Sequence, residues 1–225
     1  MGQLLLVRHG QASWGTDDYD VLSPLGWEQS RLLGAALAAR EVTPDFVVQG
    51  RMRRHRETAE AVVEGAGWQG IEVVEDEAWN EFDHLAMLAV QPWPRETSEL
   101  TPAEFQEWFV AASQRWASGE HDDDYAESYA GFAHRVRAAL ERAAQRVAAG
   151  GTGLVVTSGG PIAVAAACLA AGCDDEPPPA RMWNQLNRVA VNSSVTKVVV
   201  GRSGVATLVT FNEHGHLEGD GLTYR

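Results

Sequence analysis

The chain has 225 residues, a length that suits one large domain with its own hydrophobic core. Its hydrophobic content of 45% and charged content of 22% are ordinary for a globular protein and exclude a disordered, collagen-like or coiled-coil chain. The net charge of −13 argues against nucleic acid or an anionic membrane as the main partner. A few arginines gathered in one cleft would still suffice to bind a small anion.

The two cysteines and the N-terminal residues bear on location. Cys168 and Cys173 match neither a zinc nor a thioredoxin spacing, so they predict small core side chains in a reducing compartment. The sequence starts directly in an apolar run without a signal-peptide pattern, and no apolar run is long enough to span a membrane. We therefore expect a cytoplasmic protein without a membrane contact.

Strands and helices alternate along the first part of the chain. Short apolar runs predict strands over residues 4–7, 45–48 and 71–74. A helix is expected to begin after Ser23, which can cap it, with Pro24 at the first helical position. Thr43-Pro44 is expected to end this helix, and a second helix is predicted over 53–63.

The stretch from about 82 to 127 interrupts this alternation. It contains Trp93, Trp108 and Trp116 and a helical segment over 102–116, which predicts a mostly helical insertion covering one end of the sheet. The later elements are predicted, in chain order, as a helix over 128–149, a strand over 154–157, a helix ending near Gly172, and strands over 195–200 and 205–211.

This order of elements predicts a single three-layer α/β/α domain over residues 1–225. Strands that alternate with helices give a mainly parallel sheet, and the closing pair of strands gives it an antiparallel edge. The edge hairpin, together with tryptophans expected to be exposed, leaves room for a homodimer.

Two of the predicted strands end in residues suited to a phosphoryl group. Ligands of open α/β sheets bind beyond the carboxyl ends of the strands. The first strand runs into Arg8-His9-Gly10, in which the arginine fork fits phosphate oxygens, a neutral imidazole can attack phosphorus, and the glycine leaves room for the substrate. A later strand runs into Ser158-Gly159-Gly160 at the start of a helix, where backbone N–H groups favour an anion.

Neither motif is decisive alone. Arg8 and His9 would also suit a strand end that merely satisfies them, and the arginines of segment 51–56 would suit a solvated helix start. Taken together and in order, however, the motifs resemble the histidine phosphatase superfamily, also called phosphoglycerate-mutase-like. That family opens with a strand and Arg-His-Gly, continues with an arginine four residues before Thr-Ala, here Arg54, and then with a glutamate, here Glu81. Its strand and Gly-Gly-Pro-Ile segment match residues 155–162.

The resemblance implies a fold of the phosphoglycerate-mutase type, a small phosphomonoester as substrate, and neither metal nor cofactor. His9 would attack phosphorus and become a phosphohistidine. Arg8 and Arg54 would bind the phosphoryl oxygens and offset the charge of the transition state. Glu81 would protonate the leaving oxygen and then activate water.

The resemblance also places Ser158 and Gly159 among the phosphate-binding residues. Asp83 and His84 lie close enough to Glu81 in the sequence to compete for the role of acid. His214 and His216 stand two residues apart near acidic residues, yet no metal motif completes the set, so we interpret them as loop residues.

The chain departs from the family at one important position. The family usually has a second histidine just before its Gly-Gly pair, where this chain has Ser158. Serine donates one hydrogen bond and carries no charge, so the exchange would cost about a hundredfold in rate unless another group fills the gap. His216, after the last strand, is the candidate substitute, and a plain loop histidine is the alternative.

Smaller departures bear on the reaction. Ala12 and Gly15 stand where the family often has Thr and Asn, and Trp14 would either line the pocket or pack in the core. The less polar rim favours a phosphatase over a phosphoglycerate-type mutase. A third option is a non-catalytic protein that binds a phosphorylated ligand in a decayed site. Ser158 favours this option, whereas the presence of both a nucleophile and an acid opposes it.

Overall fold

One six-stranded sheet forms the centre of the computed structural model, which describes residues 1–13, 20–92, 100–173 and 176–224. Its strands are β1 (Gly2–Arg8), β2 (Phe46–Gln49), β3 (Glu72–Glu75), β4 (Gly151–Thr157), β5 (Val195–Val200) and β6 (Ala206–Glu213). They lie in the order β3-β2-β4-β1-β5-β6. The pairs β3–β2, β2–β4 and β4–β1 are parallel, whereas β1–β5 and β5–β6 are antiparallel. The predicted parallel sheet with an antiparallel edge is therefore confirmed.

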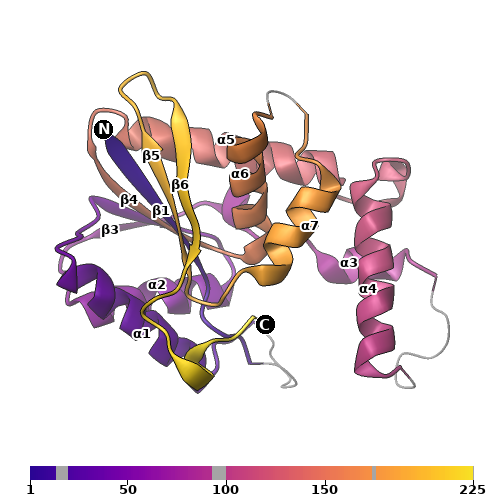
Figure 1. Ribbon diagram of the computed structural model, residues 1–225, viewed down its shortest axis with the longest axis horizontal. Coiled ribbons are helices and arrows are strands. Elements are labelled where there is room, and N and C mark those ends of the chain that lie inside the picture. Colours follow the sequence, from indigo (N-terminus) through magenta and orange to yellow (C-terminus); the bar gives the residue numbers. More distant parts are fainter. Residues whose placement is uncertain (14–19, 93–99, 174–175, 225) are drawn as a thin grey trace.

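Helices cover both faces of this sheet. They are α1 (Pro24–Ala39), α2 (Arg53–Ala66), α3 (His84–Ala89), α4 (Pro102–Ala117), α5 (Tyr129–Val147), α6 (Gly159–Ala171) and α7 (Ala180–Val189). Helices α1 and α2 pack on one face and α5 and α6 on the other, which gives the predicted three layers (Figure 1). Within the parts of the chain that the structure describes, no helix has the length and apolar character needed to cross a membrane.

Local sequence sets where the helices begin. The hydroxyl of Ser23 accepts a hydrogen bond from the Gly26 N–H at 3.0 Å, and Pro24 occupies the first turn of α1, as predicted. Ser128 caps α5 in the same way. Helix α1 ends at Ala39, before the expected Thr43-Pro44, because the chain turns back on Leu37 through hydrogen bonds from the next residues.

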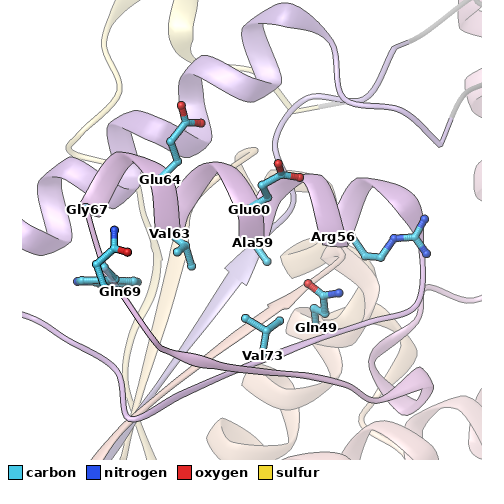
Figure 2. A pocket seen from close by; sticks show the side chains of 10 residues that line it. Gln49, Arg56, Ala59, Glu60, Val63, Glu64, Gly67, Gln69 and Val73 are labelled. Carbon is cyan, nitrogen blue, oxygen red and sulfur yellow. The ribbon is translucent and has the colours of Figure 1, made fainter.

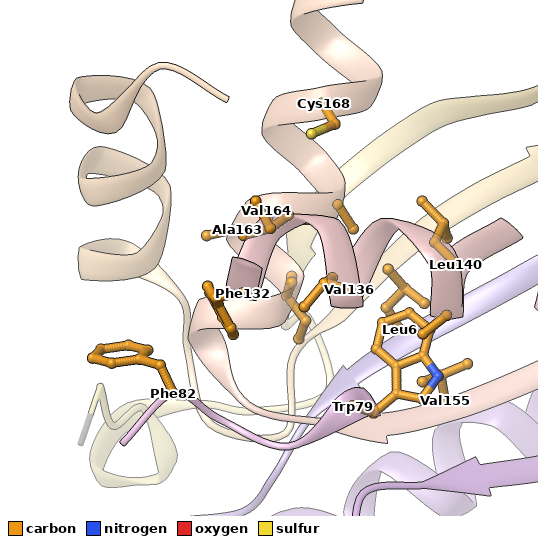
Figure 3. Close-up of a cluster of buried hydrophobic side chains, with 14 of the residues drawn as sticks. Leu6, Trp79, Phe82, Phe132, Val136, Leu140, Val155, Ala163, Val164 and Cys168 are labelled. Atoms are coloured by element: carbon orange, nitrogen blue, oxygen red, sulfur yellow. The ribbon is translucent and has the colours of Figure 1, made fainter. Parts of the chain in front are cut away.

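The larger part of the core lies between the sheet and α5 (Figure 3). Leu6 of β1 and Val155 of β4 are direct neighbours in the sheet, and both are fully buried. Phe132 and Val136 of α5 belong to the same apolar cluster, and Trp79 closes its edge. Each such side chain contributes about 1.5–3 kcal/mol through the apolar surface that it buries.

The predicted helical insertion over 82–127 holds α3 and α4, which stand apart from the sheet at one end (Figure 1). The expectation of exposed tryptophans is wrong for Trp108 and Trp116, which are both buried. Trp116 stacks on Phe82 with ring centroids 4.9 Å apart, so its apolar area joins the insertion to the core. Trp93, like Trp14 and Gly15, lies outside the described residues. Trp108 and Trp116 therefore give no support to a homodimer.

Candidate active site

His9 follows β1 directly and is buried. Its backbone N–H donates to the carbonyl of Thr157 at 2.8 Å, which ties the residue to the end of β4. Its ring Nδ1 lies 2.7 Å from the carbonyl oxygen of Gly10. A carbonyl can only accept, so Nδ1 carries the proton of the neutral ring. The lone pair is therefore on Nε2, the nitrogen that is available as a nucleophile.

The surroundings of His9 keep its imidazole neutral. Burial lowers its pKa well below the ordinary value, and the positive charges of Arg54 and Arg8 and the neighbouring His55 lower it further. The hydrogen bond with Gly10 acts in the opposite direction but does not prevail. A neutral ring at neutral pH is what nucleophilic attack on phosphorus needs.

Arg8 and Arg54 come from different elements and both act on His9. Arg54 is the second residue of α2, and its buried guanidinium donates from Nη1 to Asp20 at 2.8 Å. Arg8, the last residue of β1, donates to the carbonyls of Ala190 and Tyr224, so the returning chain fixes its side chain. The two predicted phosphate-binding arginines are thus brought to one place beside His9.

Glu81 lies at the N-terminal end of α6, opposite the glycine pair. Its carboxylate accepts hydrogen bonds from the N–H of Gly160 at 3.1 Å and from that of Phe82 at 3.2 Å. Burial raises the pKa of this carboxyl above its ordinary value despite these bonds and the charges of Arg54 and Arg8. A carboxyl that keeps its proton to higher pH is suited to act as a general acid.

Gly160 makes room for that carboxyl. A Cβ at this position would lie 2.1 Å from Oε1 of Glu81, which is far inside contact distance. Gly159 is also closely packed, since a Cβ there would lie 2.6 Å from Oδ1 of Asn187 and 3.6 Å from Nε of Arg8. The glycine pair therefore lets the acid, an arginine and the helix N-terminus converge.

Asp83 and His84, the competing candidates for the acid, have other surroundings. The carboxylate of Asp83 caps α3 by accepting from the Ala86 N–H at 2.9 Å. Burial, followed by the charge of Arg54, lowers the pKa of His84, which makes it a poor proton donor near neutral pH. Of Glu81 and His84, Glu81 is the one whose pKa moves in the direction that an acid requires.

Sequence reasoning missed His55, the residue after Arg54. His55 is fully buried, and its ring lies beside that of His9 with centroids 5.9 Å apart. Its Nε2 is 2.7 Å from Oγ of Ser158, which is also fully buried. The signal was present in the sequence, because a histidine inside a run of arginines is unusual at a helix start, yet nothing there told which way it points.

His216 does not lie beside His9 as His55 does. Burial lowers its pKa to about 4, and the groups that act on it are Ser193, Arg40 and His214. The histidine that acts on His9 is His55 instead. The expectation that His216 fills the gap left by Ser158 is thus corrected: an imidazole does meet Ser158, but it comes from α2.

A hollow of about 560 Å³ lies between α2 and the strands β2 and β3 (Figure 2). The carboxylates of Glu60 and Glu64 and the apolar side chains of Val63 and Val73 help to line it. Arg56 lines it as well, and none of the predicted site residues belongs to this lining. It is separate from the site at His9.

The fold agrees with what comparison with known proteins finds. Residues 4–213 match the histidine phosphatase superfamily (branch 1), and the chain belongs to that family. Over 90 residues it is 34% identical to the 2,3-bisphosphoglycerate-dependent phosphoglycerate mutase of Rhizobium rhizogenes. That match covers 37% of this chain and only 42% of the mutase.

Solved structures of the same fold include enzymes of both kinds. The phosphoglycerate mutase of Bacillus anthracis superposes with a TM-score of 0.65 at 20% identity, over 96% of this chain and 94% of the other. A mycobacterial glucosyl-3-phosphoglycerate phosphatase gives 0.64 at 22% identity, over 96% and 100%. At such identities the likeness establishes the fold, and the particular reaction has to be argued from the site.

Proposed function

We propose that this protein is a phosphatase that hydrolyses a small phosphomonoester through a phosphohistidine at His9. The observation that carries the proposal is that the pKa values of two groups at one site are shifted in opposite directions. His9 has a lowered pKa and a hydrogen bond that leaves Nε2 unprotonated, whereas Glu81 has a raised pKa. A neutral imidazole and a carboxyl with a raised pKa, beside two arginines, suit the cleavage of a phosphate ester.

The reaction would proceed in two steps. Nε2 of His9 attacks phosphorus, the bond from phosphorus to the ester oxygen breaks, and Glu81 gives its proton to that oxygen as the alcohol leaves. Glu81, now a carboxylate, takes a proton from water while the water oxygen attacks phosphorus. The bond from nitrogen to phosphorus then breaks and inorganic phosphate leaves. Arg8 and Arg54 offset the negative charge on the phosphoryl oxygens in both transition states.

Trapping the intermediate tests the proposal. The protein is mixed with ³²P-labelled phosphomonoester and quenched in base, in which phosphohistidine survives. We expect a labelled protein together with continuing release of phosphate, and both should vanish in His9→Ala. His134→Ala, which alters an exposed histidine of α5, is the matched control and should keep both. Hydrolysis that persists in His9→Ala would refute the role of His9, and ligand binding without label would indicate a non-catalytic protein.

A phosphoglycerate-type mutase is the second candidate, and the mutases among the curated relatives favour it. A mutase must return its phosphoryl group to the product, whereas a phosphatase gives it to water. Incubation with 3-phosphoglycerate and a trace of 2,3-bisphosphoglycerate separates the two. Appearance of 2-phosphoglycerate without release of phosphate would replace the phosphatase by the mutase.

A further inference from the structure

His55 and Ser158 form a buried pair at the nucleophile. They are 103 positions apart in the sequence, yet Nε2 and Oγ are 2.7 Å apart and neither side chain is exposed. Ser158 and His9 follow the neighbouring strands β4 and β1 side by side, because Thr157 and Arg8, one residue earlier in each strand, are paired. The pair thus spans from α2 to the turn between β4 and α6, alongside the site.

The position of the proton within this pair follows from the other ring nitrogen. Nδ1 of His55 is buried without a hydrogen-bond partner among the described residues. It faces Gly50, where a Cβ would lie 2.2 Å from Nδ1, so an α-hydrogen of that glycine points at the nitrogen. A proton on Nδ1 would meet this hydrogen and form a buried unpaired donor, which costs about 1–3 kcal/mol. A lone pair on Nδ1 instead accepts a weak C–H contact.

The proton of the ring therefore belongs on Nε2, since burial lowers the pKa of His55 and leaves the ring a single N–H. His55 then donates to Oγ of Ser158. An oxygen that accepts from His55 keeps its own hydrogen available for another acceptor. Ser158 does not use that hydrogen to cap a helix, because its side chain makes no capping bond in α6.

We propose that Ser158 donates this hydroxyl hydrogen to a phosphoryl oxygen of the substrate and that His55 is the positioning residue that holds it there. The inference rests on the proposed function at His9. The pair would thereby restore, from two elements, the donor that the family supplies with one histidine at position 158. A Cβ on Gly159, the next residue, would lie 3.6 Å from Nε of Arg8, and the ring of His55 lies beside that of His9, so the pair adjoins both groups. His55 does not touch the substrate in this arrangement.

Kinetics of single and double variants test the pair. We expect Ser158→Ala and His55→Gln each to lower kcat by about a hundredfold, the loss typical of one donor in such a site. The double variant should be no slower than either single variant, because both changes remove the same interaction. His55→Ala combined with Ser158→His, which returns the imidazole to the family position, should recover at least tenfold over Ser158→Ala. Ser113→Ala is the matched control and should keep its kcat, because it alters a buried serine of α4 whose hydroxyl donates to the carbonyl of Phe109 in the same helix.

Two further measurements distinguish a failure of this inference from a failure of the proposed function. Nitrogen-15 NMR of the histidine rings should show the proton of His55 on Nε2 and that of His9 on Nδ1; a proton on Nδ1 of His55 would overturn the inference. Binding of inorganic phosphate should weaken about tenfold in Ser158→Ala and remain unchanged in Ser113→Ala. Unchanged phosphate binding and unchanged kcat in Ser158→Ala would refute the pair while His9 keeps its role. If the unaltered protein shows no turnover dependent on His9, the proposed function fails, and phosphate binding still decides whether Ser158 is a donor.

Discussion

Substitution of Gly160 by alanine should displace the acid without touching its chemistry. The added Cβ would lie 2.1 Å from Oε1 of Glu81, whereas ordinary contact begins at 3.4 Å, so the carboxyl must retreat by about 1.3 Å. A misplacement of about 1 Å at a reacting group costs on the order of a hundredfold in rate. That factor corresponds to about 2.7 kcal/mol in the activation free energy. We therefore expect a hundredfold loss in kcat.

The leaving group shows whether the acid is the part affected. A simple alkyl phosphate needs a proton on its leaving oxygen, whereas nitrophenolate departs largely without one. Gly160→Ala should therefore lose about a hundredfold on the alkyl ester and much less on p-nitrophenyl phosphate. Equal losses on both esters, or no loss on either, would refute the assignment of Glu81.

Stability provides the control for this variant. Gly160 has a helical backbone conformation without a positive φ, and alanine is favoured over glycine in helices by about 0.5–1 kcal/mol. Gly131→Ala in α5 makes the same change where the nearest atom, Oγ of Ser128, is 3.4 Å away. That variant should keep kcat and gain a little stability in urea unfolding, which isolates the effect of the contact with Glu81.

Four other predictions concern charge, pH and the core. Asp20→Asn weakens the ion pair with Arg54, so inorganic phosphate should bind several-fold more tightly by calorimetry, and unchanged or weaker binding would contradict this competition. Because the pKa of Glu81 is raised, kcat on an alkyl phosphate should fall as rising pH removes its proton, and Glu81→Gln should abolish that limb of the pH–rate profile. The same shift makes folding favour the protonated carboxyl, so the free energy of unfolding should decline as pH rises through the folded pKa, and should not do so in Glu81→Gln. Phe132→Ala should lower the free energy of unfolding by about 3–5 kcal/mol in urea titration, and a loss under 1 kcal/mol would mean that the site refills its cavity.

Hydrophobic periodicity and the residues that begin or end helices predicted most of the fold. Apolar runs at 4–7 and 195–200 marked strands because strands buried in a sheet need such residues on both faces, and Ser23-Pro24 marked a helix start by its capping chemistry. Helices α3 and α7 were missed. Both are short, and their packing on the rest of the domain, as with the buried Trp183 of α7, is not visible in local sequence.

Site residues that belong to a single motif could be predicted from the sequence. A contact between side chains of two distant segments could not. Arg8, His9 and Arg54 stand at the end or start of an element, and Glu81 lies in the connection after β3, so the order of elements brings them to one end of the sheet. The contact between His55 and Ser158 depends on which face of α2 turns toward β4. The sequence favoured His216 as the missing histidine for the same reason, because distance along the chain says nothing about side-chain direction.

Hydrogen bonds hold the backbone of His9 from two neighbouring segments. On one side its N–H bonds to Thr157 of β4, and on the other its carbonyl accepts from Ser193 and from Asn192. Amide hydrogens in such central positions exchange with solvent mainly when much of the domain opens. We therefore expect the amide of His9 to be among the slowest to exchange in the chain. Any opening that admits a substrate or releases phosphate must come from the segments around this rigid floor.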